Sequence, residues 1–480
     1  MSARSDRYEP VIGLEVHAQL STRSKMFCGC SAAYGGEPNT QVCPVCVGLP
    51  GALPVANARA VEFAVRMGVA THCAIADESV FARKNYFYPD CPKNYQISQY
   101  DTPLCHGGHL ALAGGRRVGI TRIHLEEDAG KLLHAEGAHS LVDMNRSGVP
   151  LIEIVSEPDI RSVEEASEYL QKLRSLVRYL GICDGNMEEG SLRCDVNISV
   201  REKGSADLGV KTEVKNLNSF KQVEQALAYE FERQAGIAEA GGAVAQDTLL
   251  WNAERGVAEV MRSKEEAHDY RYFPEPDLLV LRVDESLRAR VASGMPELPD
   301  AKEARFVAQY KLPAYDAGVL TATREVADYF EAAAEAAGEA KAASNWVMGE
   351  VLRELNERKI EIAAFEVAPA ALGELIRIQV AGKINSSTAK EVLRKMIATG
   401  KTAPGIVAEK GLEQISDDDA IERAATEVLD AHPGEVSKYL GGKEKVMAFF
   451  VGQLMKATRG KANPKLATDT FKRLLEARRG

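Results

Sequence analysis

Segments in which apolar and polar residues alternate fill the chain up to about residue 300. A period of two is typical of a β-strand that has one face in contact with water. In the segment Gly13-Leu14-Glu15-Val16-His17, Leu14 and Val16 are expected on one face, and Glu15 and His17 on the other. The same pattern predicts strands within residues 8–20, 116–128, 149–159, 191–202, 209–219 and 277–283.

Helical spacing interrupts these strands and dominates the chain after Pro299. Two helices are predicted before that point, over Ala56–Ala70 and Val163–Leu180. Ser162 is a suitable N-cap for the second, and Glu164 favours its first turn. Beyond Pro299, apolar residues recur three and four positions apart. That spacing predicts helices within residues 324–341, 345–359, 370–383 and 439–456.

The change of pattern predicts mixed strands followed by an all-helical region. A further break falls near Thr402-Ala403-Pro404-Gly405. At about 150 residues per domain, 480 residues correspond to about three domains.

The charge balance limits the partners that the chain can have. Its net charge of −10 excludes a general polyanion binder, so any contact with nucleic acid requires a local basic patch. The segment Val451–Gly480 is one candidate, because it has eight basic residues against two acidic ones, a net charge of +6. No apolar run approaches the ~20 residues that span a bilayer, and no secretory signal is evident. We therefore expect a cytoplasmic protein without a membrane partner.

Four cysteines lie close together in the Gly- and Pro-rich segment 27–51. Cys28 and Cys30 form a C-x-C pair, and Cys43 and Cys46 form a C-x-x-C pair. Paired short spacings joined by a loop are typical of structural zinc, and four thiolates leave no open position for water. The spacing predicts a four-cysteine zinc site that holds the loop; four unliganded thiols remain the alternative.

The predicted strands carry many carboxylates, often beside a histidine. A single glutamate of this kind usually lies on a solvated face, but the density here favours a site for a hard cation such as Mg²⁺. The loop Arg83–Asp90 also places two cations beside three aromatic residues, and Lys84 could neutralise a phosphate. A solvated surface loop is the alternative for that segment.

Several common motifs are absent from the sequence. It has no G-x-x-x-x-G-K-[ST] phosphate loop and no G-x-G-x-x-G after a strand. It also lacks a G-x-S-x-G elbow and a serine/lysine amidase pattern. If the chain binds ATP, it does so without the common nucleotide folds, and it should not release ammonia from glutamine by itself.

Several long motifs resemble those of the B subunit in the aspartyl/glutamyl-tRNA(Asn/Gln) amidotransferase family, and the likeness extends over essentially the whole chain. They are Ile12–His17, Arg83–Asp90, His124–Lys131, Leu151–Asp159, Met187–Asp195, Glu213–Phe220 and Asp269–Asp277. The resemblance implies an α+β fold with a β-rich cradle domain over residues 1–295. A helical domain over 296–405 and a YqeY-like helical tail over 406–480, which contacts tRNA, would follow.

The resemblance also implies an activity. Such a protein uses ATP and Mg²⁺ to phosphorylate the side-chain carboxylate of Glu on tRNA(Gln) or of Asp on tRNA(Asn). Ammonia from a partner amidase (glutaminase), the A subunit, then arrives through a tunnel and displaces phosphate; the small C subunit completes the complex. Two other interpretations stay open: a non-catalytic zinc-containing tRNA-binding scaffold, and a carboxylate-amine ligase that acts on a small free acid.

By position in these motifs, the resemblance also assigns roles to residues. Lys84 falls at the reacting centre, and either Glu127 or Asp128 would deprotonate ammonium. The implied Mg²⁺ ligands are Glu15, His17, Glu126, Glu127, Glu153 and Glu189. The implied nucleotide contacts are Arg83, Asn85, Tyr86, Asp195 and Asn197. The implied tRNA contacts in the basic tail are Lys456, Arg459, Lys461 and Lys465.

Overall fold

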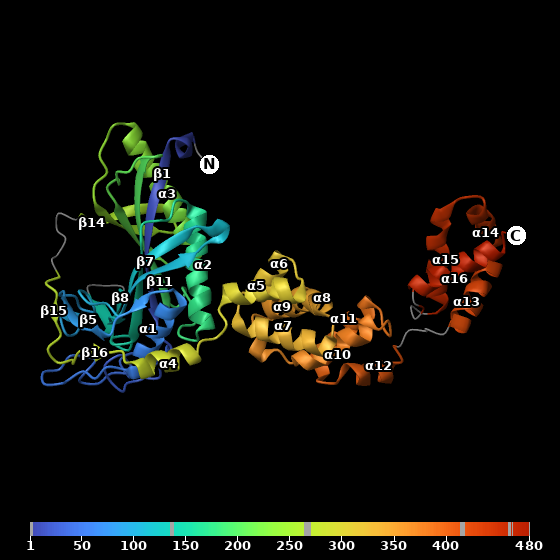
Figure 1. Ribbon diagram of the computed structural model, residues 1–480, viewed down its shortest axis with the longest axis horizontal. Helices are drawn as coiled ribbons and strands as arrows, with labels where there is room; N and C mark the ends of the chain where they lie inside the picture. Colours follow the sequence, from blue (N-terminus) through green and yellow to red (C-terminus); the bar gives the residue numbers. More distant parts are fainter. Residues whose placement is uncertain are drawn as a thin grey trace. The chain divides into compact units, whose positions relative to one another are not determined.

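The computed structural model describes residues 3–134, 139–263, 270–412, 418–458, 462 and 464–479. It divides into two compact units, Met1–Leu298 and Pro299–Gly480. The first unit is rich in strands and the second is helical (Figure 1). This arrangement confirms the α+β class that the sequence predicts.

Within the described residues, one large sheet organises the first unit. In order across the sheet, its strands are β14 (Val257–Ser263), β13 (Asp247–Asn252), β12 (Thr212–Leu217), β11 (Leu192–Glu202), β1 (Tyr8–Gln19), β10 (Pro150–Ser156), β7 (Arg117–Glu127), β6 (Cys105–Ala111) and β2 (Ala74–Ile75). Only β12 and β13 pair in parallel among these neighbours. Because β1 lies between β10 and β11, segments that are far apart in sequence become neighbours.

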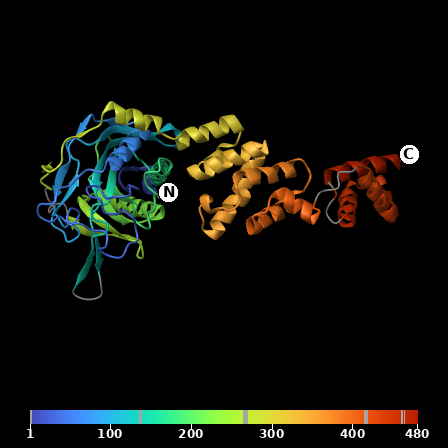
Figure 2. The same cartoon turned by 90° about the horizontal axis from the view of Figure 1, so that it is seen from below.

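Smaller sheets and helices complete the first unit. The small sheets are formed by β15 (Phe273–Pro274), β4 (Ala82–Asn85) and β5 (Tyr95–Ser98); by β16 (Leu281–Arg282) and β3 (Glu78–Ser79); and by β8 (Lys131–His134) and β9 (Ser140–Asp143). The helices are α1 (Ala58–Ala70), α2 (Val163–Tyr179), α3 (Phe220–Glu239) and α4 (Glu285–Ser293), with short 3₁₀ turns at Ala3–Asp6 and Ala113–Gly115. The strands β8 and β9 project from the unit as a hairpin (Figure 2).

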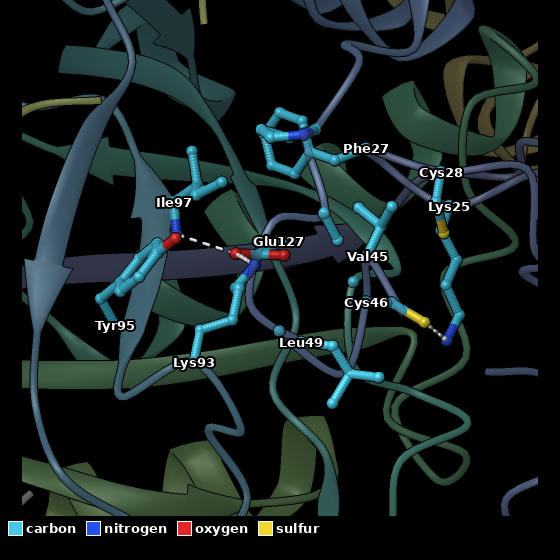
Figure 3. Close-up of a pocket in the computed structure, with 14 residues that line it drawn as sticks. Lys25, Phe27, Cys28, Val45, Cys46, Leu49, Lys93, Tyr95, Ile97 and Glu127 are labelled. Carbon is cyan, nitrogen blue, oxygen red and sulfur yellow. Dashed lines mark hydrogen bonds and ion pairs between the residues drawn. The ribbon is translucent and has the colours of Figure 1, made fainter. Parts of the chain in front are cut away.

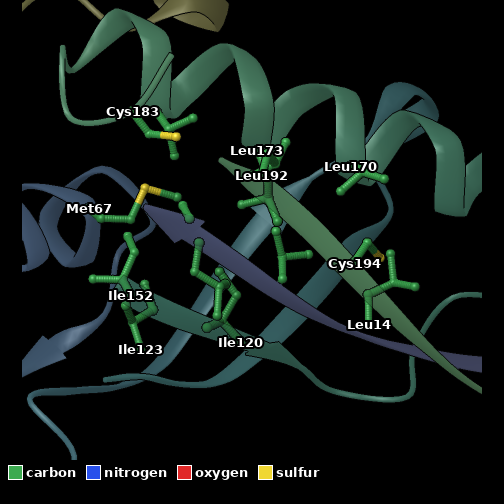
Figure 4. Close-up of a cluster of buried hydrophobic side chains, with 14 of the residues drawn as sticks. Leu14, Met67, Ile120, Ile123, Ile152, Leu170, Leu173, Cys183, Leu192 and Cys194 are labelled. Carbon is green, nitrogen blue, oxygen red and sulfur yellow. The ribbon is translucent and has the colours of Figure 1, made fainter. Parts of the chain in front are cut away.

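One face of the large sheet packs against α1, α2 and α3. Most even-numbered residues of β1, such as Leu14 and Val16, point to this face and are almost fully buried. Figure 4 shows Leu14 of β1 on the side of Leu170 of α2, and Ile152 of β10 near Met67 of α1. The opposite face carries the odd-numbered residues of β1, so the alternation in the sequence separates an apolar face from a polar one.

Most of the predicted elements are confirmed, with informative exceptions. Ser162 caps α2 as expected, since its hydroxyl accepts a hydrogen bond from the Glu165 N–H at 3.1 Å. The strand predicted over 277–283 is wrong except for Leu281–Arg282, which pairs with β3; Leu279 is 92% exposed. The helix α3, which Ser219 caps, was missed because strand patterns flank it closely.

The second unit is helical throughout its described ranges. Its α-helices are α5 (Pro299–Tyr310), α6 (Ala314–Leu320), α7 (Arg324–Ala337), α8 (Ala340–Trp346), α9 (Leu352–Arg358), α10 (Pro369–Val380), α11 (Ser386–Thr399), α12 (Ala403–Lys410), α13 (Asp418–Ala431), α14 (Pro433–Leu440), α15 (Met447–Ala457) and α16 (Pro464–Ala477). A π-helical turn at Val347–Val351 joins α8 to α9, and 3₁₀ turns lie at Ile362–Ala364 and Glu444–Val446.

Two separate hydrophobic clusters stabilise this second unit. One contains residues between Phe306 and Val407, and the other contains residues between Ile421 and Leu475. The helix predicted over 439–456 is interrupted, because Gly441 and Gly442 end α14 before α15 begins. In the described ranges, no helix combines the length and the apolar character that crossing a membrane requires.

Candidate functional site

The antiparallel register of the sheet brings charged side chains into one row. On the polar face, His17 of β1 lies opposite Glu153 of β10, and Glu153 lies opposite His124 of β7. On the other side of β1, His17 lies opposite Arg193 of β11. Directly opposed residues on one face have Cβ atoms about 5 Å apart, so the register itself creates the cluster.

The tightest part of this row is the acidic cluster, which we define as His17, Glu126 and Glu153. The His17 Nε2 atom lies 3.3 Å from Glu153 Oε2 and 3.4 Å from Glu126 Oε1. One donor atom from each of the three residues lies within 4.8 Å of the others. His124 lies beside the cluster, with its Nε2 atom 3.5 Å from Glu153 Oε2.

Burial makes it costly for the side chains of this cluster to carry a charge. Glu126 and Glu153 are only 2% and 7% exposed. Burial and the charge of Glu153 raise the pKa of Glu126. Burial also disfavours the imidazolium of His17, but the hydrogen bond and charge of Glu153 raise its pKa to about 9. Two buried carboxylates thus require a compensating cation, and the proton on His17 supplies part of it.

The donor set fits a hard divalent cation. Carboxylate oxygens with one imidazole nitrogen are suitable ligands for Mg²⁺ or Mn²⁺, and the short separations allow one ion to reach all three groups. The pKa of His124 is lowered to about 4 by burial, so this second imidazole is neutral beside the cluster. The Nδ1 atom of His124 is buried and has no hydrogen-bond partner, so the site contains one unsatisfied ring nitrogen.

Lys84 of β4 faces the same cluster. Burial opposes its charge, but Glu126 and Glu153 are among the groups that raise the pKa of its ammonium. Its Nζ atom also lies 5.0 Å from the ring centre of Tyr270. A fixed ammonium beside carboxylates suits the neutralisation of a phosphate that approaches the cluster.

Other predicted ligands lie outside the acidic cluster. Glu15 is on the same face but accepts a hydrogen bond from Asn197 Nδ2 at 3.0 Å, next to Asp195, which accepts one from Lys215 Nζ at 2.6 Å. Glu189 is exposed in the loop between α2 and β11, where its N–H donates to Asn186 Oδ1. The structure thus brings Glu15 near the row and leaves Glu189 apart from it.

Glu127 points away from the acidic cluster because it follows Glu126 on a strand. Its carboxylate forms an ion pair with Lys93 and accepts a hydrogen bond from the Ile97 N–H at 2.9 Å (Figure 3). Both side chains are largely buried. No pattern in the sequence indicates the role of Lys93, since an isolated lysine in a loop between Pro and Asn is ordinary.

Asp128 lies at the end of β7 and is held by two arginines. It accepts hydrogen bonds from Arg193 at 2.9 Å and from Gln19 Nε2 at 2.8 Å, and Arg146 lies 3.7 Å away. Burial would raise the pKa of this carboxyl, but Arg193 and Arg146 hold it below its usual range. Asp128 is therefore a weak base fixed within a charged network.

Three of the predicted nucleotide contacts hold the segment 270–277 in place. Arg83 pairs with Glu275 at 2.7 Å, and Asn85 Nδ2 donates to the Arg271 carbonyl at 2.8 Å. Tyr86 packs edge-on against Tyr270, with ring centres 6.5 Å apart. These contacts place Tyr270 next to Lys84, which sequence spacing could not indicate.

A cavity lies on the polar face beside Glu15. It has a volume of about 230 Å³, and its lining includes Gly13, Glu15, Asn197, Ser199 and Lys211. The cavity combines an acidic group, an amide, a hydroxyl and a lysine with apolar side chains such as Val155 and Leu208. Asn197 is thus the predicted nucleotide contact that lines an open space.

The four clustered cysteines form a second candidate metal centre. The Sγ atoms of Cys28, Cys30, Cys43 and Cys46 all lie within 4.8 Å of one another, and all four are free thiols. The Cys43 and Cys46 sulfurs are 3.9 Å apart. A tetrahedral zinc with Zn–S bonds of ~2.3 Å would separate its sulfurs by about 3.8 Å, so the geometry fits zinc.

The electrostatics of the cysteine loop also suit a metal. A hydrogen bond from Cys28 lowers the pKa of Cys46 to about 4, and Lys25 Nζ lies 3.6 Å from the Cys46 sulfur. A cavity of about 60 Å³ separates this loop from Lys93 and Glu127 (Figure 3). The cysteine loop therefore forms one wall of the space around Glu127.

The predicted tRNA contacts in the tail are only partly within the described residues. Lys456 is exposed near the end of α15. Lys465 lies in the first turn of α16, and Arg459 and Lys461 lie outside the described residues.

Comparisons with known proteins agree with this organisation. A family model described as the GatB/GatE catalytic domain matches residues 10–289, which contain the acidic cluster and the cysteine loop. A second model, described as the GatB domain, matches residues 328–475 of the helical unit. The chain is therefore of the GatB/GatE class.

Curated relatives define the family more closely. The B subunit of the aspartyl/glutamyl-tRNA(Asn/Gln) amidotransferase of Thermodesulfovibrio yellowstonii is 55% identical over 98% of this chain and 100% of its own length. Proteins of the same description from Pelodictyon phaeoclathratiforme and Prosthecochloris aestuarii are each 54% identical over 98% of this chain, and over 100% and 98% of their own lengths. The chain belongs to the family of B subunits of the aspartyl/glutamyl-tRNA(Asn/Gln) amidotransferase.

Proposed function

We propose that this chain is the kinase and transamidase subunit of a tRNA-dependent amidotransferase. Its substrates are Glu attached to tRNA(Gln), Asp attached to tRNA(Asn), or both, together with ATP. The observation that carries the proposal is the buried acidic cluster of His17, Glu126 and Glu153 beside Lys84. A scaffold that only binds tRNA has no use for two buried carboxylates that require a cation.

The reaction has two steps. An oxygen of the side-chain carboxylate attacks the γ-phosphorus of ATP, the bond to the ADP oxygen breaks, and an acyl phosphate forms. The nitrogen of ammonia then attacks the acyl carbon, and phosphate leaves with the electrons of the carbon–oxygen bond. The first step depends mainly on positioning and charge neutralisation, which are the properties of the charged face.

The residues of this face have separate tasks in the proposal. His17, Glu126 and Glu153 would hold Mg²⁺, which neutralises phosphate charge when bound. The Lys84 ammonium stabilises the phosphate oxygens that approach the cluster. The nucleotide occupies the cavity of about 230 Å³ beside Glu15, where Asn197 supplies an amide donor and Lys211 a positive charge.

Glu127 is the better candidate for the base that deprotonates ammonium. Asp128 is bound by two arginines that hold its pKa below the usual range, which makes it a poor proton acceptor. Glu127 instead borders a cavity of about 60 Å³, which gives ammonium a space beside its carboxylate. Ammonium that reached this cavity would lose its extra proton before it met the acyl phosphate.

The remaining parts of the chain support this chemistry. We propose that the four cysteines bind a structural zinc that fixes the wall of the Glu127 cavity. Ammonia comes from the partner amidase, and the small C subunit completes the complex. Basic residues of the tail, with Lys456 among them, contact the tRNA body through phosphates. The cytoplasm is the proposed location, because the substrate is a charged tRNA.

Transfer of labelled γ-phosphate from ATP tests the proposal. The purified three-subunit complex is given Glu-tRNA(Gln), uncharged tRNA or free glutamate in parallel. We expect ATP cleavage only with the charged tRNA, and we expect Glu126→Gln to lower it about 10²- to 10³-fold. Glutaminase activity should survive in this variant. Glu335→Gln, which changes an exposed carboxylate of α7, is the matched control.

The outcomes separate the alternatives. Cleavage that persists in Glu126→Gln would move the phosphorylation step away from this cluster and favour a tRNA-binding scaffold. Cleavage with free glutamate would favour a ligase for a small acid.

A further inference from the structure

A row of tyrosines leads outward from Lys84. Tyr270 lies beneath the Lys84 ammonium, and Tyr272 meets Tyr270 edge-on with ring centres 6.2 Å apart. Tyr272 is stacked in turn on Tyr100, with ring centres 4.2 Å apart and an interplanar angle of 8°. We call Tyr100 and Tyr272 the tyrosine platform.

The tyrosine platform is open to solvent although it is aromatic. Tyr100 is 52% exposed and Tyr272 is half-buried. Large aromatic residues usually contribute buried area, so a stacked pair that faces water is available for a ligand with a flat ring. One face of the Tyr100 ring is covered by Tyr272, so a ligand would stack on the other face.

Hydrogen bonds from β4 hold the segment that carries Tyr272. Asn85 Nδ2 donates hydrogen bonds to the carbonyls of Tyr270 and Arg271, at 3.3 and 2.8 Å. Arg83 makes two hydrogen bonds of 2.7 Å to Glu275, a residue that is 3% exposed. A ligand that stacked on this surface would therefore not have to order the segment first, which reduces the cost of binding.

The direction of the row indicates what the platform binds. Its inner end is Lys84, whose ammonium is under the influence of Glu126 and Glu153. A charged tRNA has an unpaired 3′ end, and its last ribose carries the amino acid. If the last base is held at the outer end of the row, the ribose and the amino acid extend inward, toward Lys84 and the acidic cluster.

We propose that the tyrosine platform stacks the unpaired 3′-terminal adenine of the charged tRNA and so aims the aminoacyl group at the acidic cluster. The inference rests on the proposed function. Unpaired bases stack on exposed aromatic rings independently of sequence, because every base has a flat π-face. The proposed function places ATP in the cavity beside Glu15 and Asn197, whose lining residues are different from those of this row.

Fluorescence of a modified tRNA tests the platform directly. The probe is uncharged tRNA(Gln) with 2-aminopurine at its 3′ end, bound to the full three-subunit complex. Stacking on the platform should quench the probe in the wild type and in Tyr100→Phe, which keeps the ring. Tyr100→Leu, which keeps apolar volume but removes the ring, should abolish the quench. Tyr315→Leu changes a tyrosine of α6 that is 77% exposed and serves as the control.

Kinetics supply a second readout. For transamidation, Tyr100→Leu should raise the KM for Glu-tRNA(Gln) about tenfold and leave the KM for ATP unchanged. Glutaminase activity, measured in the same preparations, reports that the variant complex is folded and assembled. Tyr100→Phe should restore the wild-type KM.

The results distinguish failure of the inference from failure of the proposed function. Quenching and a KM for Glu-tRNA(Gln) that are unchanged in Tyr100→Leu would overturn the platform. A raised KM for ATP with normal quenching would also overturn it, and would assign the rings to the nucleotide. Absence of ATP cleavage in the wild-type complex would instead contradict the proposed function, while the fluorescence test with uncharged tRNA would still decide the platform.

Discussion

The cysteine loop and the acidic cluster both offer metal ligands, but the chain assembles them differently. The four cysteines fall within residues 28–46, on a loop that can fold around an ion almost by itself. His17, Glu126 and Glu153 come from β1, β7 and β10, and only the antiparallel register brings them together. Local ligands thus suit a site that stabilises a loop, whereas ligands on a rigid sheet suit a site that positions substrates.

The space around Glu127 links these two regions. Glu127 follows Glu126 along β7 and therefore faces the cysteine loop instead of the acidic cluster. One strand end thus presents a carboxylate to each of the two candidate metal centres. If the proposed function holds, phosphorylation depends on one side of β7 and the supply of ammonia on the other.

The largest effect is expected from Glu153→Gln. This carboxylate lies between the two imidazoles, so its loss removes the charge that a cation in the cluster would balance. Mn²⁺ affinity, measured by electron paramagnetic resonance, and charged-tRNA-dependent ATP cleavage should both fall about 10³-fold. Zinc content should remain unchanged. A parallel loss of zinc would contradict the independence of the two centres.

Lys93→Met should destabilise the first unit. It leaves the buried Glu127 carboxylate without its partner, at a cost of about 3 kcal/mol in the free energy of unfolding. The chain has two tryptophans, so Trp251 fluorescence in a Trp346→Phe background follows this unit alone. Arg282→Met removes an exposed pair with Glu78 in the same unit and should cost less than about 1 kcal/mol. Equal losses of stability in Lys93→Met and Arg282→Met would show that the Glu127 carboxylate is solvated.

A smaller effect on catalysis is expected from Cys30→Ser. The variant should lose zinc, and proteolysis should cut within residues 27–51, because the loop would no longer be held by the metal. ATP cleavage should stay within about threefold of wild type, since the acidic cluster does not share these ligands. Metal analysis beside Cys73→Ser provides the comparison. Full zinc content in Cys30→Ser would refute the four-cysteine centre.

Glu189→Gln is expected to have the smallest effect. The motif of this residue implies a metal ligand, but the structure leaves its side chain exposed in a loop apart from the acidic cluster. Mn²⁺ affinity and ATP cleavage should therefore remain within about twofold of wild type, as for ordinary surface substitutions. A loss comparable to that of Glu153→Gln would show that this loop joins the cluster when substrate binds.

Sequence patterns predicted much of the fold because each strand and helix carries its own period. The alternation in β1 and the Ser162 cap of α2 are local features, and both are found. The apolar run at 277–283 misled the prediction, because β propensity alone does not provide a partner strand. The break at Gly441-Gly442 was missed because the apolar spacing continues on both sides of it.

The candidate sites also differ in how much of each could be predicted from local sequence patterns. Sequence alone determined the four-cysteine arrangement. Its ligands lie on one short segment, so their separation in sequence limits how far apart they can lie in space. The sequence motif assigned both Glu126 and Glu127 to Mg²⁺, and this is wrong for Glu127, because neighbours on a strand face opposite sides and its carboxylate pairs with Lys93. Only the tertiary structure decided that His17 and Glu153 meet across two strands, that Lys93 pairs with Glu127, and that a tyrosine row begins at Lys84. Strand order and register depend on packing over the whole sheet, and no local pattern records them.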